Sequence, residues 1–403
     1  MWKKWLFHAT DFQSLMYPSF TFSRILGIFP NRINASTFKS SKQRYILSIV
    51  LICIICSCNL YIIYEILISK RIDFRKLTKN LEATSFYVCS GFTAIVTYSS
   101  TESRTRLLQI ILKVSSQLPP ESYQKLSKLI HIKDILNTFI LLMQSCVYYI
   151  KIRKYLEMNI FVLYINQVML QMEMQYMNYV CITKACFKRI NDDLMHIQKL
   201  INDNPYAPRL IGHMQKNQLL LTKLKTLKKQ HSIISDVVQM LNVTFSLQLL
   251  ATIVLTFTEV TFEIYSHAVQ WKDGLLTIIL DDEITNIFFI INVTYNITKL
   301  ILIVWACETC KNQAFEIGTT IHDILNSTND TEIKEELQLF SLQLLHRNNI
   351  FSAKGLTVDA TLLTAMVGGI TTYILILIQF MIMSHSCDKK FSSNITQTKL
   401  NPM

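Results

Sequence analysis

The chain has 403 residues, of which 50% are hydrophobic and 17% are charged, whereas a soluble globular protein carries about 25% charged residues. This composition excludes a disordered chain, a small disulfide-rich domain, collagen and a coiled coil. Long apolar runs also disfavour a soluble enzyme of several domains. The net charge of +12 fits the basic cytoplasmic loops of a membrane protein better than a nucleic-acid binder.

Seven apolar segments approach the length of about 20 residues that a helix needs to cross a bilayer. They are Tyr45–Ile68, Ala83–Ser100, Ile135–Ile150, Tyr155–Thr183, Val243–Tyr265, Ile284–Cys307 and Leu362–Met383. The first, fifth, sixth and seventh are the most apolar, the second is rich in Ser and Thr, and the third is the shortest. The sequence therefore predicts an all-α, polytopic membrane protein with seven transmembrane helices.

The distribution of Lys and Arg predicts the orientation. If the N-terminus is cytoplasmic, about two thirds of these basic residues lie on the cytoplasmic side, as the positive-inside rule requires. The C-terminus is then extracellular. The predicted order is a cytoplasmic N-terminal segment (1–44), spans one to four (45–183), a cytoplasmic helical loop (184–242), spans five and six (243–307), a cytoplasmic helical segment (308–355), span seven (356–384) and an extracellular tail (385–403).

Two cytoplasmic stretches have helical periodicity. Between Lys184 and Met240, apolar residues recur at spacings of three, four and seven among lysines, which predicts an amphipathic helix. Thr331–Ile350 has a similar pattern after Asp330, a candidate N-terminal cap. Such helices either lie on anionic lipid or extend the neighbouring spans and pack together. We favour packing, because both helices run almost directly into the next span.

The sequence shows no catalytic or cofactor-binding motif. It has no phosphate-binding loop, no Rossmann glycine pattern and no G-x-S-x-G. The lone Cys307-x-x-Cys310 has no second pair or neighbouring histidine to complete a zinc site. No enzyme activity, cofactor, metal or nucleic-acid partner is therefore expected. Among the glycosylation sequons, only Asn394 falls in the predicted extracellular tail.

The last span contains the most informative motif. Thr372-Tyr373, five aliphatic residues and Gln379-Phe380 reproduce the signature of insect gustatory receptors. The segment Arg24-Ile-Leu-Gly27-Ile-Phe-Pro30 resembles that family's sequence before the first span. Length, seven spans and a cytoplasmic N-terminus agree with the family as well. The chain thus resembles an insect gustatory receptor over essentially its whole length.

The resemblance implies a ligand-gated, non-selective cation channel. It also implies a tetramer, either a homotetramer or a heteromer with other gustatory receptors, in which the last span of each subunit lines the pore. The implied pore and gate residues are Thr372, Tyr373, Leu375, Ile376, Gln379 and Phe380. A run of aliphatic side chains closes a pore by dewetting, and Gly368-Gly369 is expected to allow a bend. The alternative for Thr372, Tyr373 and Gln379 is hydrogen bonding between helices.

The resemblance further implies a ligand pocket in the extracellular half of each subunit, between spans two to six. The candidate ligand-binding residues are Phe86, Tyr87, Tyr148, Asn159, Tyr164, Glu259, Phe262, Glu263, Phe289 and Asn292. An aromatic pocket with a few polar groups suits a small organic molecule. Glu259 and Glu263 are costly within an apolar span, so they either bind a cationic, alkaloid-like ligand or face water beyond an earlier end of the helix. Lys299 is expected to reach toward the cytoplasmic surface.

Ile374 narrows the ligand class, because many sugar receptors of the family have Glu at this position. The favoured function is detection of a small tastant, a bitter or plant-derived deterrent. The protein is expected to lie in the plasma membrane of gustatory receptor neurons, in contact with membrane lipid. A fructose- or polyol-type receptor and an odorant receptor of the same architecture are alternatives. A G-protein-coupled receptor is a further alternative, which the charge distribution and the absence of Asp-Arg-Tyr and Asn-Pro-x-x-Tyr motifs oppose.

Overall fold

The structure is a computed structural model that describes residues 7–29, 31–34, 37–72, 77–151, 156–202, 210–273 and 281–398. Its helices are α2 (Phe12–Ile25), α3 (Lys42–Leu67), α4 (Leu77–Ser99), α5 (Thr101–Ser115), α6 (Pro120–Lys151), α7 (Leu156–Asn202), α8 (Leu210–Asp273), α9 (Asp281–Ser327), α10 (Thr331–His346) and α11 (Ala360–Thr398). Two short antiparallel hairpins join them, β1 (Asn31–Asn34) with β2 (Thr37–Ser40) and β3 (Ser352–Ala353) with β4 (Leu356–Thr357). The predicted all-α fold is confirmed.

Each of the seven predicted spans coincides with one of these helices, in the order α3, α4, α6, α7, α8, α9 and α11, although Ile68 and Ser100 lie one residue beyond the ends of α3 and α4. Tyr155, the predicted first residue of span four, lies outside the described residues. Four stretches in the described part of the chain are apolar and long enough to cross a membrane, Lys42–Leu67, Asn217–Val269, Ile284–Ser327 and Ala360–Met383. These contain the four spans with the most apolar sequences.

Helix α7 explains why a span can be less apolar and still lie within the bundle. Every residue from Gln167 to Thr183 is buried, because α6, α8 and α9 pack around it. Its polar side chains have partners inside the protein: the Gln171 amide donates to the Ser19 hydroxyl at 2.9 Å, and the Asn178 amide donates to the Asp134 carboxylate at 3.0 Å. Polar side chains within a span are stable when they face such partners rather than lipid.

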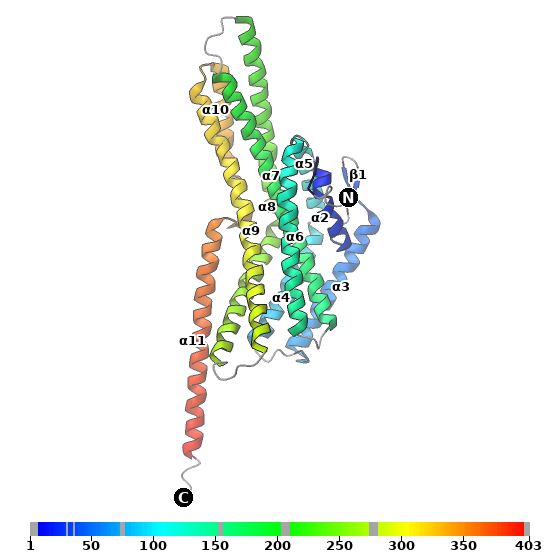
Figure 1. Ribbon diagram of the computed structural model, residues 1–403, viewed down its shortest axis with the longest axis vertical. Helices are drawn as coiled ribbons and strands as arrows, with labels where there is room; N and C mark the ends of the chain where they lie inside the picture. The colour runs from blue at the N-terminus through cyan, green and yellow to red at the C-terminus, as the bar shows by residue number, and fades with distance from the viewer. Residues whose placement is uncertain are drawn as a thin grey trace.

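The predicted cytoplasmic helices form a packed extension at one end of the molecule (Figure 1). Leu224, Leu227, Ile234 and Val238 of α8 are buried, and α10 packs against both α8 and α9. The Asp330 side chain caps α10 by accepting a hydrogen bond from the Ile333 backbone at 3.0 Å. Packing of the two amphipathic segments, rather than attachment to a lipid surface, is what the structure shows.

One part of that prediction is wrong, because α10 does not run directly into the last span. A hairpin intervenes, with Ser352 opposite Thr357 and a turn at Lys354 and Gly355, both of which have positive φ angles. Asn242 of α8 holds the connection: its amide donates to the Ile350 carbonyl at 2.7 Å, and its oxygen accepts from the Ser352 backbone at 3.1 Å. The start of α11 is thereby fixed to α8.

Helix α11 stands apart from the rest of the bundle (Figure 1). Only 11% of its most apolar window is buried, against 61% for that of α8. It is helical through Gly368 and Gly369 and continues beyond the predicted end at Met383 to Thr398, so the glycines do not interrupt it. Asn394 lies on this last part of the helix, and its side chain lies outside the described residues.

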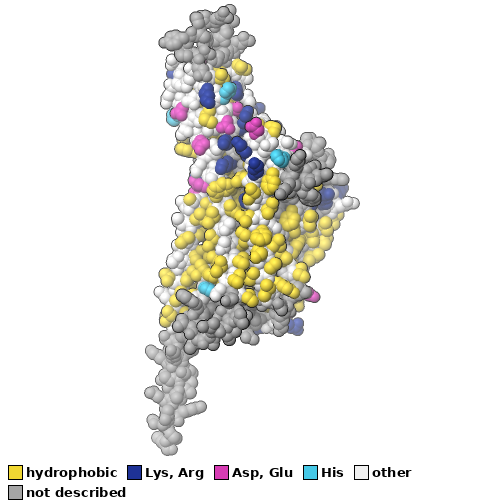
Figure 2. All heavy atoms as spheres, viewed as in Figure 1, with side chains coloured by type: hydrophobic (Ala, Val, Ile, Leu, Met, Phe, Trp, Pro, Cys, Tyr) yellow, Lys and Arg dark blue, Asp and Glu magenta, His cyan; other side chains and the backbone are white. Residues whose placement is uncertain are grey.

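The surface has an apolar band with basic side chains at one edge (Figure 2). The band covers the lower half of the bundle, and Lys and Arg gather where it meets the packed extension. The C-terminal end of α11 lies at the opposite end of the molecule from α10 (Figure 1). The charge distribution of the sequence assigns the α10 end to the cytoplasm, and this orientation stays a prediction.

Candidate functional site

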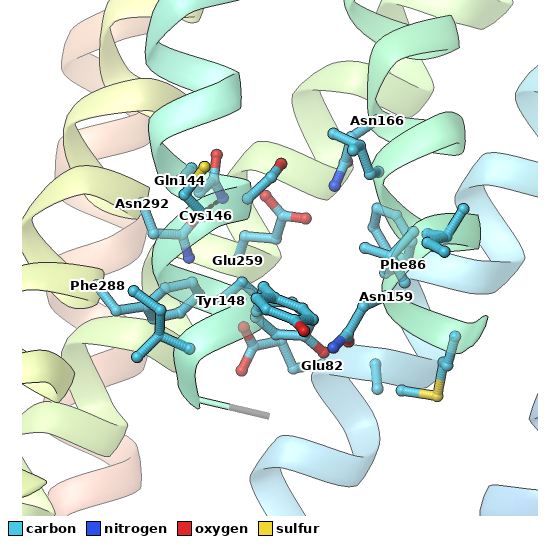
Figure 3. A pocket seen from close by; sticks show the side chains of 18 of the residues that line it. Glu82, Phe86, Gln144, Cys146, Tyr148, Asn159, Asn166, Glu259, Phe288 and Asn292 are labelled. Atoms are coloured by element: carbon cyan, nitrogen blue, oxygen red, sulfur yellow. Dashed lines mark hydrogen bonds between the residues drawn. The ribbon is translucent and has the colours of Figure 1, made fainter. Parts of the chain in front are cut away.

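A cavity lies among five helices, α4, α6, α7, α8 and α9 (Figure 3). Its volume is about 720 Å³, within the range of small-molecule pockets. It is lined by residues near the start of α4, α7 and α9 and near the end of α6 and α8, so it lies in the half of the bundle away from α10. The predicted position between spans two and six agrees with this geometry.

The cavity brings together seven of the ten candidate ligand-binding residues. These are Phe86, Tyr87, Tyr148, Asn159, Glu259, Glu263 and Asn292. Figure 3 shows Glu259, Asn292 and Tyr148 around the same space, on three different helices. Whether these side chains bind a ligand stays a prediction.

The other three candidates lie elsewhere. Tyr164 donates a hydrogen bond to the Leu26 carbonyl at 3.0 Å, on the side of α7 that faces the N-terminal segment. Phe289 stacks on His267, with ring centroids 4.1 Å apart. Phe262 is half-buried on α8 and is not among the residues that line the cavity. The candidates were chosen because they lie in the extracellular half of the spans. Successive residues of a helix point about 100° apart, so this choice does not specify which side chains face the cavity.

The acidic residues of the cavity outnumber its basic ones. Lys79 of α4 contacts Glu82 of its own helix at 2.9 Å and Glu263 of α8 at 2.7 Å. Glu259, one turn before Glu263, points into the cavity (Figure 3). Two carboxylates therefore share the Lys79 ammonium group, and Glu259 is the carboxylate of the cavity outside that ion-pair cluster.

This arrangement argues against one of the two interpretations of the glutamates, that both face water beyond an earlier helix end. Helix α8 continues to Asp273, and Glu263 is 5% exposed, so the pair does not face water beyond an earlier helix end. Glu263 already has Lys79 as its partner within the protein. Sequence reasoning missed Lys79 and Glu82, because the segment before Ala83 was assigned to a loop. Lys79 precedes Glu82 by three residues and Glu82 precedes Phe86 by four, a spacing that would have placed all three on one helical face.

Amide groups form the deeper wall of the cavity. The Gln144 amide of α6 donates to the Asn292 oxygen of α9 at 2.8 Å, and Asn296 donates to the same oxygen at 3.2 Å. Asn159 and Asn166 of α7 lie across the cavity from them (Figure 3). Aromatic rings complete the lining, with Tyr148 and Phe288 5.8 Å apart.

Lys299, two turns after the cavity residue Asn292 on α9, is buried in the bundle and does not reach its surface. It is 4% exposed, and its Nζ lies 3.5 Å from Glu173 of α7. Glu173 also accepts a hydrogen bond from Thr252 of α8 at 2.9 Å, and the Lys299 ammonium lies over the Tyr295 ring. The prediction for Lys299 is wrong because a buried carboxylate stabilises the ammonium within the bundle.

The predicted gate residues lie along α11. Leu375 and Phe380 are 55% and 68% exposed, and Thr372 and Gln379 are exposed as well. Thr372 hydrogen bonds to the Gly368 carbonyl of its own helix, so it does not join two helices within this chain. Ile376 is 39% exposed. Most of the signature is therefore available to surfaces outside the single chain.

Tyr373 is the exception, because it contacts α8. Its ring meets the Phe257 ring edge-on, with centroids 5.6 Å apart. Gly369 lies one turn earlier, and a Cβ there would be 3.0 Å from the Phe257 ring. Phe257 precedes Glu259 by two residues, so one short piece of α8 touches both the cavity and α11.

Comparison with known proteins agrees with this architecture. Residues 16–384 match the model of the 7tm chemosensory receptor family. The chain belongs to this family of insect gustatory and odorant receptors. Its signature in α11 and its match across nearly the whole chain lead to the same assignment.

Two gustatory receptors of Drosophila melanogaster are similar in sequence to this chemosensory receptor. Gustatory receptor 28a is 31% identical over 175 residues, which cover 43% of this chain and 38% of that receptor. Gustatory receptor 28b is 32% identical over 153 residues, which cover 37% of this chain and 32% of that receptor. The aligned segments thus span about a third of each relative's length.

The fold matches that of an insect olfactory receptor. OR5 from Machilis hrabei superposes with a TM-score of 0.66 over 91% of this chain and 98% of that chain, at 13% sequence identity. The same receptor in complex with eugenol gives a TM-score of 0.68, with the same coverage and identity. The polytopic helical fold is therefore shared at low overall sequence identity.

Proposed function

We propose that this chemosensory receptor is a gustatory receptor, a ligand-gated, non-selective cation channel opened by a small tastant of the bitter or plant-derived deterrent class. The observation that supports it best is the position of α8, which lines the 720 Å³ cavity with Glu259 and contacts the exposed helix α11 through Phe257. A ligand that moves this part of α8 changes the position of α11.

The charge of the cavity favours a cationic ligand. Lys79 is shared by Glu82 and Glu263, and Glu259 has no ion pair with a lysine or arginine among the described residues. A protonated amine beside Glu259 gains a charge-assisted contact in a site of low dielectric constant. Phe86, Tyr148 and Phe288 supply aromatic surface for the apolar body of the ligand and for cation–π contacts. Alkaloids combine these features.

A polyol or fructose-type ligand is the second candidate. Gln144, Asn159, Asn166 and Asn292 offer amide groups on opposite walls of the cavity, which suit a ligand with several hydroxyls. Ile374, where many sugar receptors have Glu, favours the deterrent class instead. The olfactory receptor in complex with eugenol is an example of a protein of this fold that binds a small aromatic molecule. The family match favours a receptor channel over a G-protein-coupled receptor.

Four copies of the chain are proposed to surround one pore, with α11 of each copy on its wall. A helix with 11% of its apolar window buried needs either lipid or other subunits to cover it. Its exposed polar side chains, Thr372 and Gln379, fit a pore better than a purely lipid-facing surface. The proposed orientation has α10 in the cytoplasm and the C-terminus outside, in the plasma membrane of gustatory receptor neurons.

Calcium imaging of cells that express this chain alone tests the proposal with a panel of alkaloids and sugars. We expect a response to at least one cationic compound, and Glu259→Gln should raise its half-maximal concentration about tenfold or more. Glu335→Gln, the same change on an exposed face of α10, is the matched control and should respond normally. A response only to uncharged sugars, unaffected by Glu259→Gln, contradicts the cationic ligand. No response to any compound contradicts the channel function of the chain alone.

A further inference from the structure

A second cavity lies between α2 and the first turns of α3, far from the tastant pocket. Its volume is about 300 Å³. One wall is the Arg24–Phe29 segment, which the sequence signature of the family singled out and which the proposed function leaves without a role. The other wall is the start of the first span, with Arg44, Leu47 and Ser48. Figure 1 shows α2 beside this part of α3, at the end of the bundle nearer α10.

The turn after α2 packs closely against α3. Gly27 has a φ angle of +76°, and a Cβ at this position would lie 2.1 Å from the Leu51 side chain, so glycine is required both for the backbone and for the close approach. The Ser48 hydroxyl donates to the Gly27 carbonyl at 2.6 Å. The close packing and the hydrogen bond therefore hold the two walls of the cavity together, the Arg24–Phe29 segment and the start of α3.

Two arginines of like charge line this small space. Arg24 comes from the end of α2 and Arg44 from the start of α3. Burial, and then the Arg44 guanidinium, lower the pKa of Arg24, which is the direction expected when two cations share a site. No Asp or Glu is among the described residues that line the cavity. The site thus has the charge that an anion would complement.

Some hydrogen-bond donors that line the cavity also lack an acceptor. The Nε of Arg24 and the hydroxyl of Thr21 are buried and have no hydrogen-bond partner among the described residues. The Arg24 guanidinium lies over the Phe29 ring, 5.7 Å from its centroid, which holds it in place without using its N–H groups. Buried donors of this kind usually have a partner, and an oxygen-rich anion supplies acceptors for several at once.

The mouth of the cavity continues onto apolar surface. Ile25 and Leu47, which line it, are 74% and 53% exposed, and Val50 and Ile54 continue the exposed apolar face along α3 at 48% and 50%. This face lies on α3, which has the highest mean hydropathy, 2.7, of the four candidate spans in the described residues. A free anion gains nothing from such a surface, whereas a lipid places its acyl chains there.

We propose that this cavity binds the phosphate group of an anionic phospholipid, with the headgroup between Arg24 and Arg44 and the acyl chains along Leu47, Val50 and Ile54. Arginine binds phosphate oxygens with two N–H groups at a time, and basic pockets beside spans on the cytoplasmic side are known to hold anionic headgroups. The lipid joins the segment before the first span to the span itself. The site is independent of the tastant and of the ligand class proposed above.

Native mass spectrometry of the purified full-length receptor in detergent tests this site. The probes are a short-chain phosphatidylinositol phosphate, the matching phosphatidylcholine, and inorganic phosphate. We expect the inositol lipid to bind at least tenfold more tightly than phosphatidylcholine, and Arg24→Gln with Arg44→Gln to remove that preference. Equal binding of the two lipids, or a preference that survives the double variant, overturns the proposal. Inorganic phosphate binding as tightly as the inositol lipid shows a solute site and also overturns it.

Matched variants separate this result from misfolding. Arg106→Gln with Lys113→Gln removes the same charge from exposed positions of α5 and should leave the preference intact. Arg44→Gln alone removes one of the two cations and should weaken binding severalfold while the melting temperature without lipid stays within a few degrees of that of the wild type. In the wild type the inositol lipid should raise the melting temperature more than phosphatidylcholine does. No such difference in the wild type counts against the site.

Discussion

Helices α7 and α11 show that burial in this receptor does not follow hydropathy. Helix α7 is buried from Gln167 to Thr183 although it contains Gln171, Glu173, Gln175 and Asn178. Helix α11 is far more apolar, yet only 11% of its apolar window is buried. In water such an exposed apolar helix would be unstable, but in a bilayer lipid solvates it. Polar side chains instead require partners, and α7 takes them from its neighbours.

This difference in burial indicates different roles for α7 and α11. The centre of α7 is fixed by hydrogen bonds to α2, α6 and α8, which suits a rigid scaffold for the cavity. Helix α11 is held to its own chain near its start, by the tether and by Leu362 and Met366 in the core, and further along by Gly369 and Tyr373 against Phe257. A helix with few contacts in its own subunit is free to shift when α8 moves. The following variants test this division, from the largest expected effect to the smallest.

The largest effect is expected at the buried ion pair of α7. Lys299→Met leaves Glu173 as an unpaired charge in the centre of the bundle, at a cost of about 3–5 kcal/mol. We expect severe loss of surface expression, measured by labelling of intact cells. Adding Glu173→Gln should restore much of it, since the remaining charge is then gone. Arg106→Met, which breaks the exposed pair with Glu102, costs about 0–1 kcal/mol and is the control. Normal expression of Lys299→Met contradicts the scaffold role.

Two adjacent glycines provide the sharpest test of the contact between α8 and α11. Gly369→Ala places a methyl group 3.0 Å from the Phe257 ring, whereas Gly368→Ala meets no atom within 4 Å. Both changes raise helix propensity by the same amount. We expect Gly369→Ala to shift the half-maximal ligand concentration severalfold in whole-cell recordings, with Gly368→Ala close to wild type. Equal effects of the two substitutions would remove the argument for coupling at Phe257.

The signature residues on the free face of α11 should affect current but not folding. Phe380 is 68% exposed, and Gln379 is exposed beside it, so truncation removes little packing within the subunit. Gln379→Ala or Phe380→Ala should change basal or evoked current while surface labelling stays near the wild-type level. If currents are unchanged in both variants, these residues do not form the gate.

The smallest effect is expected from Tyr373→Phe. The ring keeps its edge-on contact with Phe257. Its hydroxyl has no hydrogen bond to any of the described residues, so the concentration–response curve should stay within about twofold of wild type. Tyr373→Ala removes the ring and should resemble Gly369→Ala in shifting the curve. A strong effect of Tyr373→Phe would show that the hydroxyl, rather than the ring contact, makes the residue part of the signature.

The sequence predicted the helices better than it predicted the side chains between them. Long apolar runs placed all seven spans, since length and hydropathy set them independently of packing. Phe288 lines the cavity, whereas its neighbour Phe289 stacks on His267. Which of the two side chains faces the cavity depends on the rotation of α9 about its axis, and composition does not specify that rotation. The ion-pair cluster of Lys79 and the pairing of Lys299 with Glu173 join residues far apart in the sequence. Such contacts depend on the tertiary arrangement, which hydropathy does not specify.

The mass of the purified receptor tests the central proposal most directly, namely that α11 is covered by other copies of the chain around a common pore. Mass photometry in a mild detergent should show a particle of four chains, each of 46.8 kDa, and the same particle should pass cations when it is reconstituted into vesicles. A particle of one chain, in a preparation that folds normally and conducts, would contradict the shared pore.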